Sequence, residues 1–276
     1  MTTLIFGAAG FLGQQLLESL PNAVGSSVDI ADASAVRRAI EDRAPEIVVN
    51  CAGKTGRPNV DWCESHREET VRSNVTGALV LLDECQKRRL YLVHLSTGCL
   101  FQGDNNGRGF AEDDPPNFAG SYYVRTKVHA DQILAEFPVL ILRPRMPFDD
   151  SLHERTLLGK LRKYERVLDT ANSLTYIPDF LTAARQLIDE RRTGIYHVVN
   201  PGVTTPFEVM CRYREIVDPE HHFGRLSVDQ LTEVTTAARS SCTLSTDKLQ
   251  ACGITIQPVS AAIETALTAI ARAAKG

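Results

Sequence analysis

The sequence has little that would suit it to a membrane, a disulfide scaffold or nucleic acid. Its first apolar stretch, within MTTLIFGAAGFLGQQ, is short, rich in glycine and without the charged segment of a signal sequence. Its seven cysteines are an odd number without paired spacing, which favours a reducing compartment. A net charge of -4 with interspersed signs provides no basic stripe for a phosphate backbone. We therefore expect a soluble, cytoplasmic protein that binds neither nucleic acid nor membranes.

Metal-ligand patterns are also scarce. Cys63 and His66 come nearest to a zinc-binding pair, but no second pair at a suitable spacing follows them. The adjacent His221 and His222 cannot easily share one tetrahedral site. We therefore expect no metal site.

What the sequence does contain is an alternation of short apolar runs with longer helical periods, in a chain that is 43% hydrophobic. This alternation is typical of βα units and a parallel sheet. The predicted strands are TLIF (3–6), EIVVN (46–50) and YLVHLS (91–96), and the predicted helices are GFLGQQLLESL (10–20), SAVRRAIEDR (34–43) and EETVRSNVTGALVLLDECQKR (68–88).

The sequence thus predicts a doubly wound parallel α/β sheet of Rossmann type with a smaller C-terminal substrate-binding lobe. We expect residues 1–145 to bind the cofactor, residues 179–199 to return to the sheet, and residues 146–276 to form most of the lobe. The polar, Gly- and Pro-rich segment 102–120 is expected to be a loop over a site.

A glycine triplet follows the first predicted strand. Gly7, Gly10 and Gly13 in GAAGFLG would let the backbone, with Phe11 and Leu12, approach a pyrophosphate at a helix N-terminus. An ordinary tight strand-to-helix turn is the alternative. The segment NAVGSS (22–27) offers no acidic residue before Asp29 to hold the adenosine ribose hydroxyls, so a 2'-phosphate would not be repelled. NADP(H) is therefore the preferred cofactor, with NAD(H) as the alternative.

A tyrosine and a lysine lie four residues apart in YVRTK. On a helix, Tyr123 and Lys127 project from the same face, and we expect the ammonium to lower the pKa of the phenol towards neutrality. Tyr123 could then give a proton to a carbonyl oxygen as hydride reaches the carbon. Tyr122 has no lysine at this spacing and is not expected to take part.

These motifs resemble the extended short-chain dehydrogenases/reductases. Thr97 with Tyr123 and Lys127 matches their Ser/Thr-Tyr-Lys triad, and Asn74 in VRSNVTG matches their helix asparagine. The order of motifs resembles dTDP-4-dehydrorhamnose reductase, and a longer similarity reaches the bifunctional 3,5-epimerase/4-keto reductase of rhamnose synthesis. The strings that carry it are GKTGRPNVDWCESHREET, STGCLF, GFAEDDPPNFAGSYYVRTK, RPRMPF and NPGVTT.

The resemblance implies further cofactor contacts. Asp29 and Ile30 in VDIAD would lie against adenine, and Asn50, Ala52 and Gly53 in NCAG would lie beside the cofactor. A buried strand end explains NCAG almost as well. The resemblance also implies that homodimers form, because extended reductases commonly dimerise.

Two residues carry the epimerase part of the resemblance. Cys99 in STGCLF matches the epimerisation cysteine of that family, and Lys160 in LLGKLRKYERV matches its lysine. A thiol can serve as an acid or base at the carbons flanking a ketone. The alternatives are a half-buried strand residue for Cys99 and, for Lys160, solvation or a diphosphate contact shared with Arg162 and Lys163.

The remaining substrate candidates have plainer alternatives. Arg57 and Asn59 would shape the sugar pocket, unless they are ordinary polar loop residues. Arg145 and Met146 would wall the nicotinamide, and Arg239 in AARSS would contact the nucleotide diphosphate. Trp62 is expected to pack rather than to stack on a ligand.

The resemblance implies an oxidoreductase that epimerises carbons 3 and 5 of a UDP- or dTDP-linked 4-keto-6-deoxyglucose and reduces its ketone, giving a nucleotide-L-rhamnose. One alternative is a plain 4-keto reductase or a coupled epimerase-reductase of another nucleotide-sugar, similar to GDP-fucose synthase. A second is a cofactor-binding regulatory subunit like that of methionine adenosyltransferase, which resembles the same reductases. The intact set Thr97, Tyr123 and Lys127 argues against the regulatory subunit.

Overall fold

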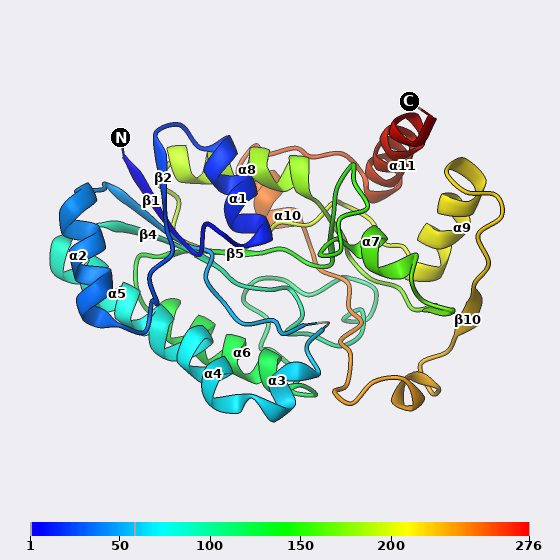
Figure 1. Cartoon of the computed structure of the whole chain (residues 1–276), viewed down its shortest axis with the longest axis horizontal. Coiled ribbons are helices and arrows are strands. Elements are labelled where there is room, and N and C mark those ends of the chain that lie inside the picture. Colours follow the sequence, from blue (N-terminus) through cyan, green and yellow to red (C-terminus); the bar gives the residue numbers. More distant parts are fainter. Residues whose placement is uncertain (1, 58, 276) are drawn as a thin grey trace. The chain divides into compact units, whose positions relative to one another are not determined.

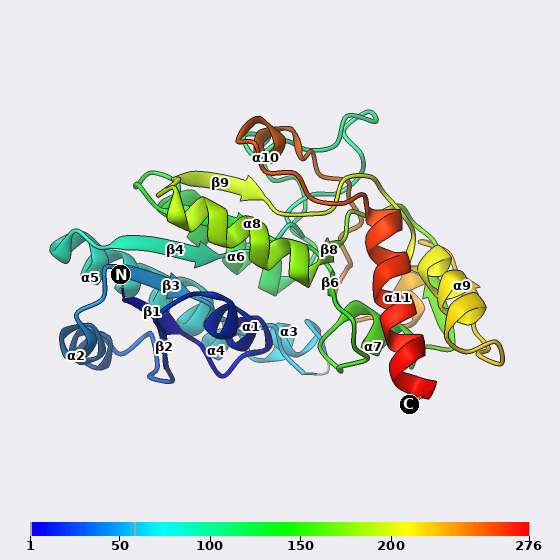
Figure 2. The same cartoon turned by 90° about the horizontal axis from the view of Figure 1, so that it is seen from above.

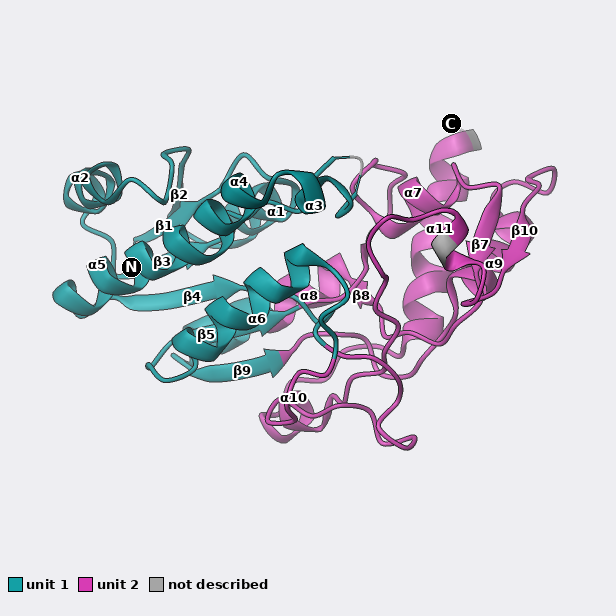
Figure 3. Ribbon diagram, turned by 90° about the horizontal axis from the view of Figure 1, so that it is seen from below, with its two compact units in different colours: residues 1–100, 118–143, 184–196 teal, residues 101–117, 144–183, 197–276 magenta. Residues whose placement is uncertain are grey.

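The structure is a computed structural model and describes residues 2–57 and 59–275. The chain divides into two compact units, drawn in teal and magenta in Figure 3. Unit 1 comprises Met1–Leu100, Phe118–Arg143 and Ala184–Tyr196, and unit 2 comprises Phe101–Asn117, Pro144–Ala183 and His197–Gly276. The predicted loop 102–120 therefore belongs largely to unit 2, where Gly103 and Phe110 form bridges to Cys242 and Leu244.

A six-stranded sheet forms the centre of unit 1. Its strands follow the order β2-β1-β3-β4-β5-β9, and β1 pairs parallel to β2 and β3, β3 to β4, and β4 to β5. The inner strands consist mainly of apolar residues because both faces of the sheet are covered. The strands are β1 (Thr3–Phe6), β2 (Ala23–Ser26), β3 (Ile47–Asn50), β4 (Tyr91–Leu95), β5 (Leu140–Arg143) and β9 (Gly194–His197).

Helices lie on both faces of this sheet, which confirms the prediction of a doubly wound α/β fold (Figures 1 and 2). One face carries α1 (Phe11–Ser19) and residues 184–189 of α8 (Ile177–Asp189). The other carries α2 (Ala33–Arg43), α5 (Gly77–Arg88) and α6 (Tyr122–Leu134), whose apolar sides share one core with β1, β3, β4 and β5.

The helix predicted over residues 68–88 is not continuous. After α3 (Trp62–Ser65), the chain forms α4 (Arg67–Val71), a π-helical turn η1 (Arg72–Thr76) and then α5. Periodicity cannot locate such a turn, because the apolar pattern continues through it. A π-turn inside a helix frequently marks a functional position, and this one contains the buried Asn74.

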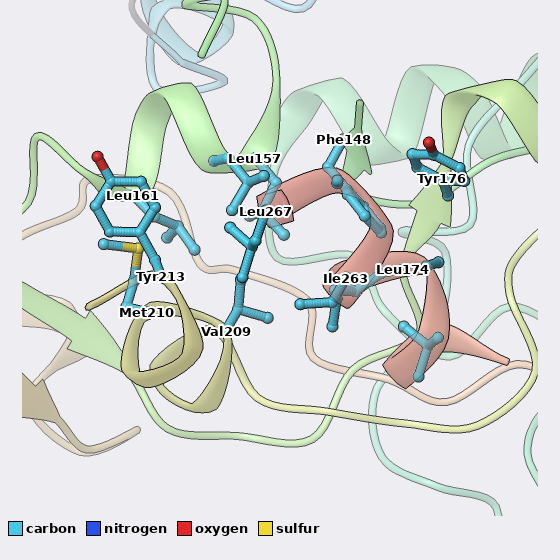
Figure 4. Close-up of a cluster of buried hydrophobic side chains, with 14 of the residues drawn as sticks. Phe148, Leu157, Leu161, Leu174, Tyr176, Val209, Met210, Tyr213, Ile263 and Leu267 are labelled. Atoms are coloured by element: carbon cyan, nitrogen blue, oxygen red, sulfur yellow. The ribbon is translucent and has the colours of Figure 1, made fainter. Parts of the chain in front are cut away.

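Unit 2 is organised around an apolar cluster rather than a large sheet (Figure 4). Val209 and Met210 of α9 and Ile263 and Leu267 of α11 meet Leu157 of α7 there. The elements of unit 2 are β6 (Pro147–Phe148), α7 (Leu157–Leu161), β7 (Arg166–Leu168), β8 (Thr175–Tyr176), α9 (Pro206–Ile216), β10 (Gly224–Leu226), η2 (Leu231–Glu233), α10 (Asp247–Ala251) and α11 (Val259–Lys275).

Among the described residues, no helix combines the length and the apolar character needed to cross a bilayer.

Gly159 is required where α7 approaches the preceding loop. A Cβ atom at this position would lie 2.0 Å from the carbonyl oxygen of His153. We expect Gly159→Ala to lower the free energy of unfolding by about 1–3 kcal/mol, because backbone must move to relieve the clash. Urea unfolding measures the change. Gly224→Ala is the control, because its Cβ would meet Arg166 Cγ at an ordinary 3.6 Å; equal loss in both variants would contradict the prediction.

Candidate active site

The first turn of α6 is fixed from two directions. The Ser121 hydroxyl caps the helix by accepting a hydrogen bond from the Val124 N–H at 3.3 Å. The Glu64 carboxylate, from α3, accepts another from the Tyr122 N–H at 2.6 Å. Because Tyr123 stands in this turn, both contacts hold the backbone that carries the predicted catalytic phenol.

The Tyr123 side chain lies beside Thr97, two residues beyond the end of β4. The Thr97 hydroxyl hydrogen-bonds Tyr123, and Cys99 is near enough for a thiolate charge there to raise the pKa of the phenol. The Cys99 N–H donates to Thr97 Oγ1 at 3.2 Å, and the Cys99 side chain is half-buried. Unit 1 therefore brings together three of the predicted catalytic side chains, namely Thr97, Cys99 and Tyr123.

The prediction that the pKa of Tyr123 is lowered towards neutrality is wrong. Burial, the largest influence, raises the pKa of Tyr123, and the hydrogen bond from Thr97 lowers it only in part. The Lys127 Nζ atom contacts Leu95 O at 2.9 Å and His94 Nε2 at 3.2 Å. Burial also lowers the pKa of Lys127 to about 8, so its ammonium is less favoured than at the protein surface.

Tyr122 is placed differently. Its ring lies against the guanidinium groups of Arg67 and Arg125, at 5.4 and 5.5 Å from their central carbons. The two neighbouring tyrosines thus occupy separate surroundings, because successive helical residues point about 100° apart.

Asn74 joins three segments of unit 1. Its Oδ1 accepts from the Lys54 N–H at 2.7 Å, and its Nδ2 donates to Lys54 O and to Thr126 Oγ1 at 3.0 and 3.1 Å. Thr126 Oγ1 in turn donates to Tyr123 O. The amide group therefore links the segment after β3 to the backbone of α6 and supports the position of Tyr123.

The glycine turn after β1 fits an anionic cofactor. A Cβ at Gly7, whose φ is +76°, would lie 2.4 Å from Ala52 N, and a Cβ at Gly13 would lie 2.2 Å from Gly7 O. These two glycines allow α1 to pack close to β1 and β3. Gly10 differs, because it is exposed at the N-cap and provides no side-chain cap for the first N–H groups of α1. Those N–H groups can bind phosphate oxygens. The half-buried Phe11 and Leu12 lie at this end of the helix.

The other predicted cofactor residues take several positions around β3 and β2. Asp29 accepts from the Ala31 N–H and pairs with Arg72 at 2.9 Å, and both contacts lower its pKa. Ile30 is buried, and its side chain would touch any Cβ added at Gly77. Gly53 is exposed beside the half-buried Ala52, and Asn50 is buried.

Sequence reasoning missed Arg72 and His94, which now join this site. Arg72 lies on η1, and no local pattern links it to Asp29, which is 43 residues earlier in the chain. His94 lies within an apolar strand pattern, where a histidine reads as core, and only the fold shows that it links Asn50 to Lys127.

The loop after β3 uses the predicted substrate residue Asn59 to start α3. Asn59 Oδ1 accepts from the Asp61 N–H at 2.8 Å, while Arg57 is exposed. Trp62 stacks on His66 with ring centroids 4.0 Å apart. Their contacts with a substrate remain predictions.

Unit 2 holds the other predicted substrate residues. Lys160 is half-buried on α7, whereas Arg162 and Lys163 are exposed. The buried guanidinium of Arg145 donates to Asn172 Oδ1, Ser240 Oγ and Ser240 O, so much of its capacity is used within the unit.

Met146 has a positive φ of 43°, a strained conformation that functional sites often contain. The half-buried Arg239 donates to Ala237 O at 2.9 Å. Ligand roles for these unit 2 residues remain predictions.

Among the residues that the structure describes, no three His, Cys, Asp or Glu side chains gather where they could hold a metal ion. Cys63, one of the two nearest candidates, instead donates weakly to Lys54 O.

The fold and these side chains define a Rossmann-like α/β protein with a tyrosine and a lysine at the carboxyl end of its sheet. A family model described as the RmlD substrate binding domain matches residues 1–272. The chain belongs to this family.

The curated and solved relatives agree with this assignment. The chain is 38% identical over 259 residues to an Arabidopsis thaliana protein named bifunctional dTDP-4-dehydrorhamnose 3,5-epimerase/dTDP-4-dehydrorhamnose reductase, covering 90% of this chain and 86% of that protein. It spans only 38–39% of three trifunctional enzymes of the same plant.

Two solved structures extend the similarity to three dimensions. The L780 UDP-rhamnose synthase from Acanthamoeba polyphaga mimivirus superposes with a TM-score of 0.93 at 31% identity, covering 98% of this chain and 99% of that one. The dTDP-4-dehydrorhamnose reductase from Bacillus anthracis, solved in complex with NADP, superposes with a TM-score of 0.81 at 26% identity, covering 97% of each chain.

The low pKa of Lys127 makes stability depend on pH. Because folding lowers this pKa from 10.5 to about 8, the unfolded chain binds more protons than the native chain between these pH values. The free energy of unfolding of the wild type minus that of Lys127→Met should therefore rise with pH across this window. Its slope should approach about 1.4 kcal/mol per pH unit.

Chemical denaturation at several pH values measures this difference. Lys163→Met, at an exposed position, is the control for the removal of a lysine charge. A flat difference between wild type and Lys127→Met would contradict the prediction.

Proposed function

We propose that this protein is an NADPH-dependent reductase of a nucleotide-linked 4-keto-6-deoxy sugar that also epimerises carbons 3 and 5, so that its product is a nucleotide-L-rhamnose. The observation that carries the proposal is the joint placement of the Tyr123 phenol, the Thr97 hydroxyl and the Cys99 thiol at one strand end. The names of the relatives support the same substrate class and both reactions.

The cofactor would lie along the turn after β1. Gly10 and the first N–H groups of α1 would bind its pyrophosphate, and the absence of an acidic side chain in NAVGSS (22–27), directly before VDIAD, favours the 2'-phosphate of NADP(H) over NAD(H). Adenine would lie near Asp29. The bound cofactor supplies hydride to carbon 4 of the sugar. NADP in the Bacillus anthracis relative supports this choice.

Tyr123 would act as the acid of the reduction. Its raised pKa keeps the phenol protonated, so it can donate a hydrogen bond and then a proton to the oxygen on carbon 4. Thr97 would hold the same oxygen through its hydroxyl. A ketone polarised by these two groups also acidifies the hydrogens on the flanking carbons, because the enolate charge spreads onto the oxygen that they bind.

Cys99 would exchange protons at those flanking carbons. It is half-buried and adjacent to Tyr123, so a sugar whose ketone faces the phenol presents carbons 3 and 5 to the same neighbourhood. Lys160 would be the second member of the acid/base pair for epimerisation. The sequence resemblance and its half-buried position support this role. Arg57, Asn59, Met146 and Arg239 would contact the rest of the substrate. Cytoplasmic location and homodimer formation remain predictions from the sequence.

Tyr123→Phe should lower the rate of NADPH-dependent ketone reduction by about 100-fold or more, because the phenolic proton donor is lost. Absorbance of NADPH with UDP- or dTDP-4-keto-6-deoxyglucose measures this rate. Tyr122→Phe removes a phenol from the neighbouring position and should leave the rate unchanged. Normal reduction by Tyr123→Phe would refute the assignment of the acid.

Cys99→Ser should abolish solvent deuterium incorporation at carbons 3 and 5 while sparing reduction of an already epimerised ketone. The reason is that a serine hydroxyl is a far weaker acid than a thiol and does not ionise near neutral pH. Mass and NMR analysis of the sugar after incubation in heavy water gives both readouts. Cys211→Ser, on α9 of unit 2, is the matched control. Continued deuterium incorporation in Cys99→Ser would exclude the thiol.

A further inference from the structure

His94 is a buried titratable residue for which the proposed reaction has no use. It lies on β4 with an exposed fraction of 1%, and its two ring nitrogens contact Asn50 on one side and Lys127 on the other. Asn50 and Lys127 are equally enclosed, at 1% and 3% exposed. Water therefore cannot satisfy these atoms, and each must find its donor or acceptor within the group.

The orientation of the Asn50 amide determines the protonation of the histidine. The Ala52 N–H can only donate, so the Asn50 atom 3.0 Å from it must be the carbonyl oxygen. The Asn50 NH2 group then faces His94 Nδ1 at 3.0 Å. Nδ1 must accept this hydrogen bond, and the single proton of a neutral imidazole is left on Nε2.

The same assignment of donors and acceptors applies to the contact between His94 and Lys127. His94 Nε2 and Lys127 Nζ are 3.2 Å apart, and such a contact requires a proton on one nitrogen and a lone pair on the other. Nε2 carries the proton, so Nζ must supply the lone pair. A neutral amine has one lone pair for Nε2–H and still has N–H groups to donate to Leu95 O at 2.9 Å. An ammonium group has no lone pair and would place two donors face to face.

A doubly protonated histidine does not resolve the conflict. It would point Nδ1–H at the Asn50 NH2 group, and burial, the largest cause, holds the pKa of His94 well below its usual range. The other titratable groups facing Lys127 are Cys51, which follows β3, and Asp131 on α6, and both raise the pKa of Lys127. Asp131 is itself paired with Arg143 of β5 at 2.9 Å, which reduces the effect of its charge.

We propose that His94 is a positioning residue that donates Nε2–H to Lys127 and thereby disfavours the ammonium form of Lys127 in the ligand-free protein. Lys127 can take up a proton only after Nζ has moved away from Nε2. Its consequence for catalysis rests on the proposed function: as long as Nζ accepts from Nε2–H, no ammonium acts on Tyr123, and a positive charge that would stabilise the phenolate arises only when Lys127 is released. The proton arrangement itself does not depend on that function.

The proton positions can be read directly by NMR. In ligand-free protein labelled with nitrogen-15 in histidine, His94 should show a protonated Nε2 and an unprotonated Nδ1 throughout the neutral pH range. His94→Gln identifies the signal by its disappearance. A proton on Nδ1 of His94 would overturn the proposal, and this measurement on wild-type protein stands even if the variant folds poorly.

The second measurement follows Lys127. With carbon-13 at the lysine Cε positions, the chain has seven signals, and Lys127→Met identifies the one of interest. In His94→Gln the amide can turn its oxygen towards Nζ and accept from an ammonium, so the proton affinity of Lys127 should rise about tenfold or more. His129→Gln, on the exposed side of α6, should cause no change. An unaltered Lys127 titration in folded His94→Gln would overturn the proposal.

Kinetics separate this inference from the proposed function. In the plot of kcat against pH, the transition that Lys127 controls should move to higher pH in His94→Gln, with little change in KM for the sugar. A histidine with only a structural role would, when replaced, lower activity equally at every pH. The NMR results need neither cofactor nor sugar. If no keto-sugar is reduced while the predicted proton positions are found, the proposed function fails and the inference about His94 stands.

Discussion

The contact between α6 and the end of β4 is the interaction on which the rest of the site depends. Lys127 Nζ donates to the carbonyl oxygen of Leu95, the last residue of that strand, and lies against His94 from the same strand. The contact places Tyr123, one helical turn earlier on α6, beside Thr97 and Cys99, which follow the strand. Backbone geometry therefore brings the phenol, the hydroxyl and the thiol together before any ligand arrives.

Several residues that the sequence predicts as ligand contacts also stabilise this arrangement. Asn74 uses both of its amide atoms to join Lys54 to α6, and Asn50 uses its oxygen on Ala52. Gly7 and Gly13 allow close approach of backbone to backbone. Such residues are as necessary to the chemistry as the groups that touch a substrate, because a displacement of about 1 Å in a catalytic group can lower its rate by about 100-fold.

Burial dominates the electrostatics of the site. An ammonium four residues from a phenol favours the phenolate in water-like surroundings, but here burial shifts the pKa of each group towards its neutral form. The pair is consequently held in the state in which the phenol can give away a proton. The protonation of Lys127 then depends on its hydrogen bond with His94, so the lysine is not charged under all conditions.

Much of this protein was determined by the sequence alone, because the patterns concerned are local. The period of apolar residues predicted the parallel α/β sheet, and the four-residue spacing predicted that Tyr123 and Lys127 share a helix face. Only the tertiary structure determined three other features. These are the partners that control the protonation of Tyr123 and Lys127, the π-turn at Asn74, and the hydrogen bonds of Arg145 to Asn172 and Ser240. Hydrogen bonding and the removal of water depend on which distant segments pack together, and no local pattern records that.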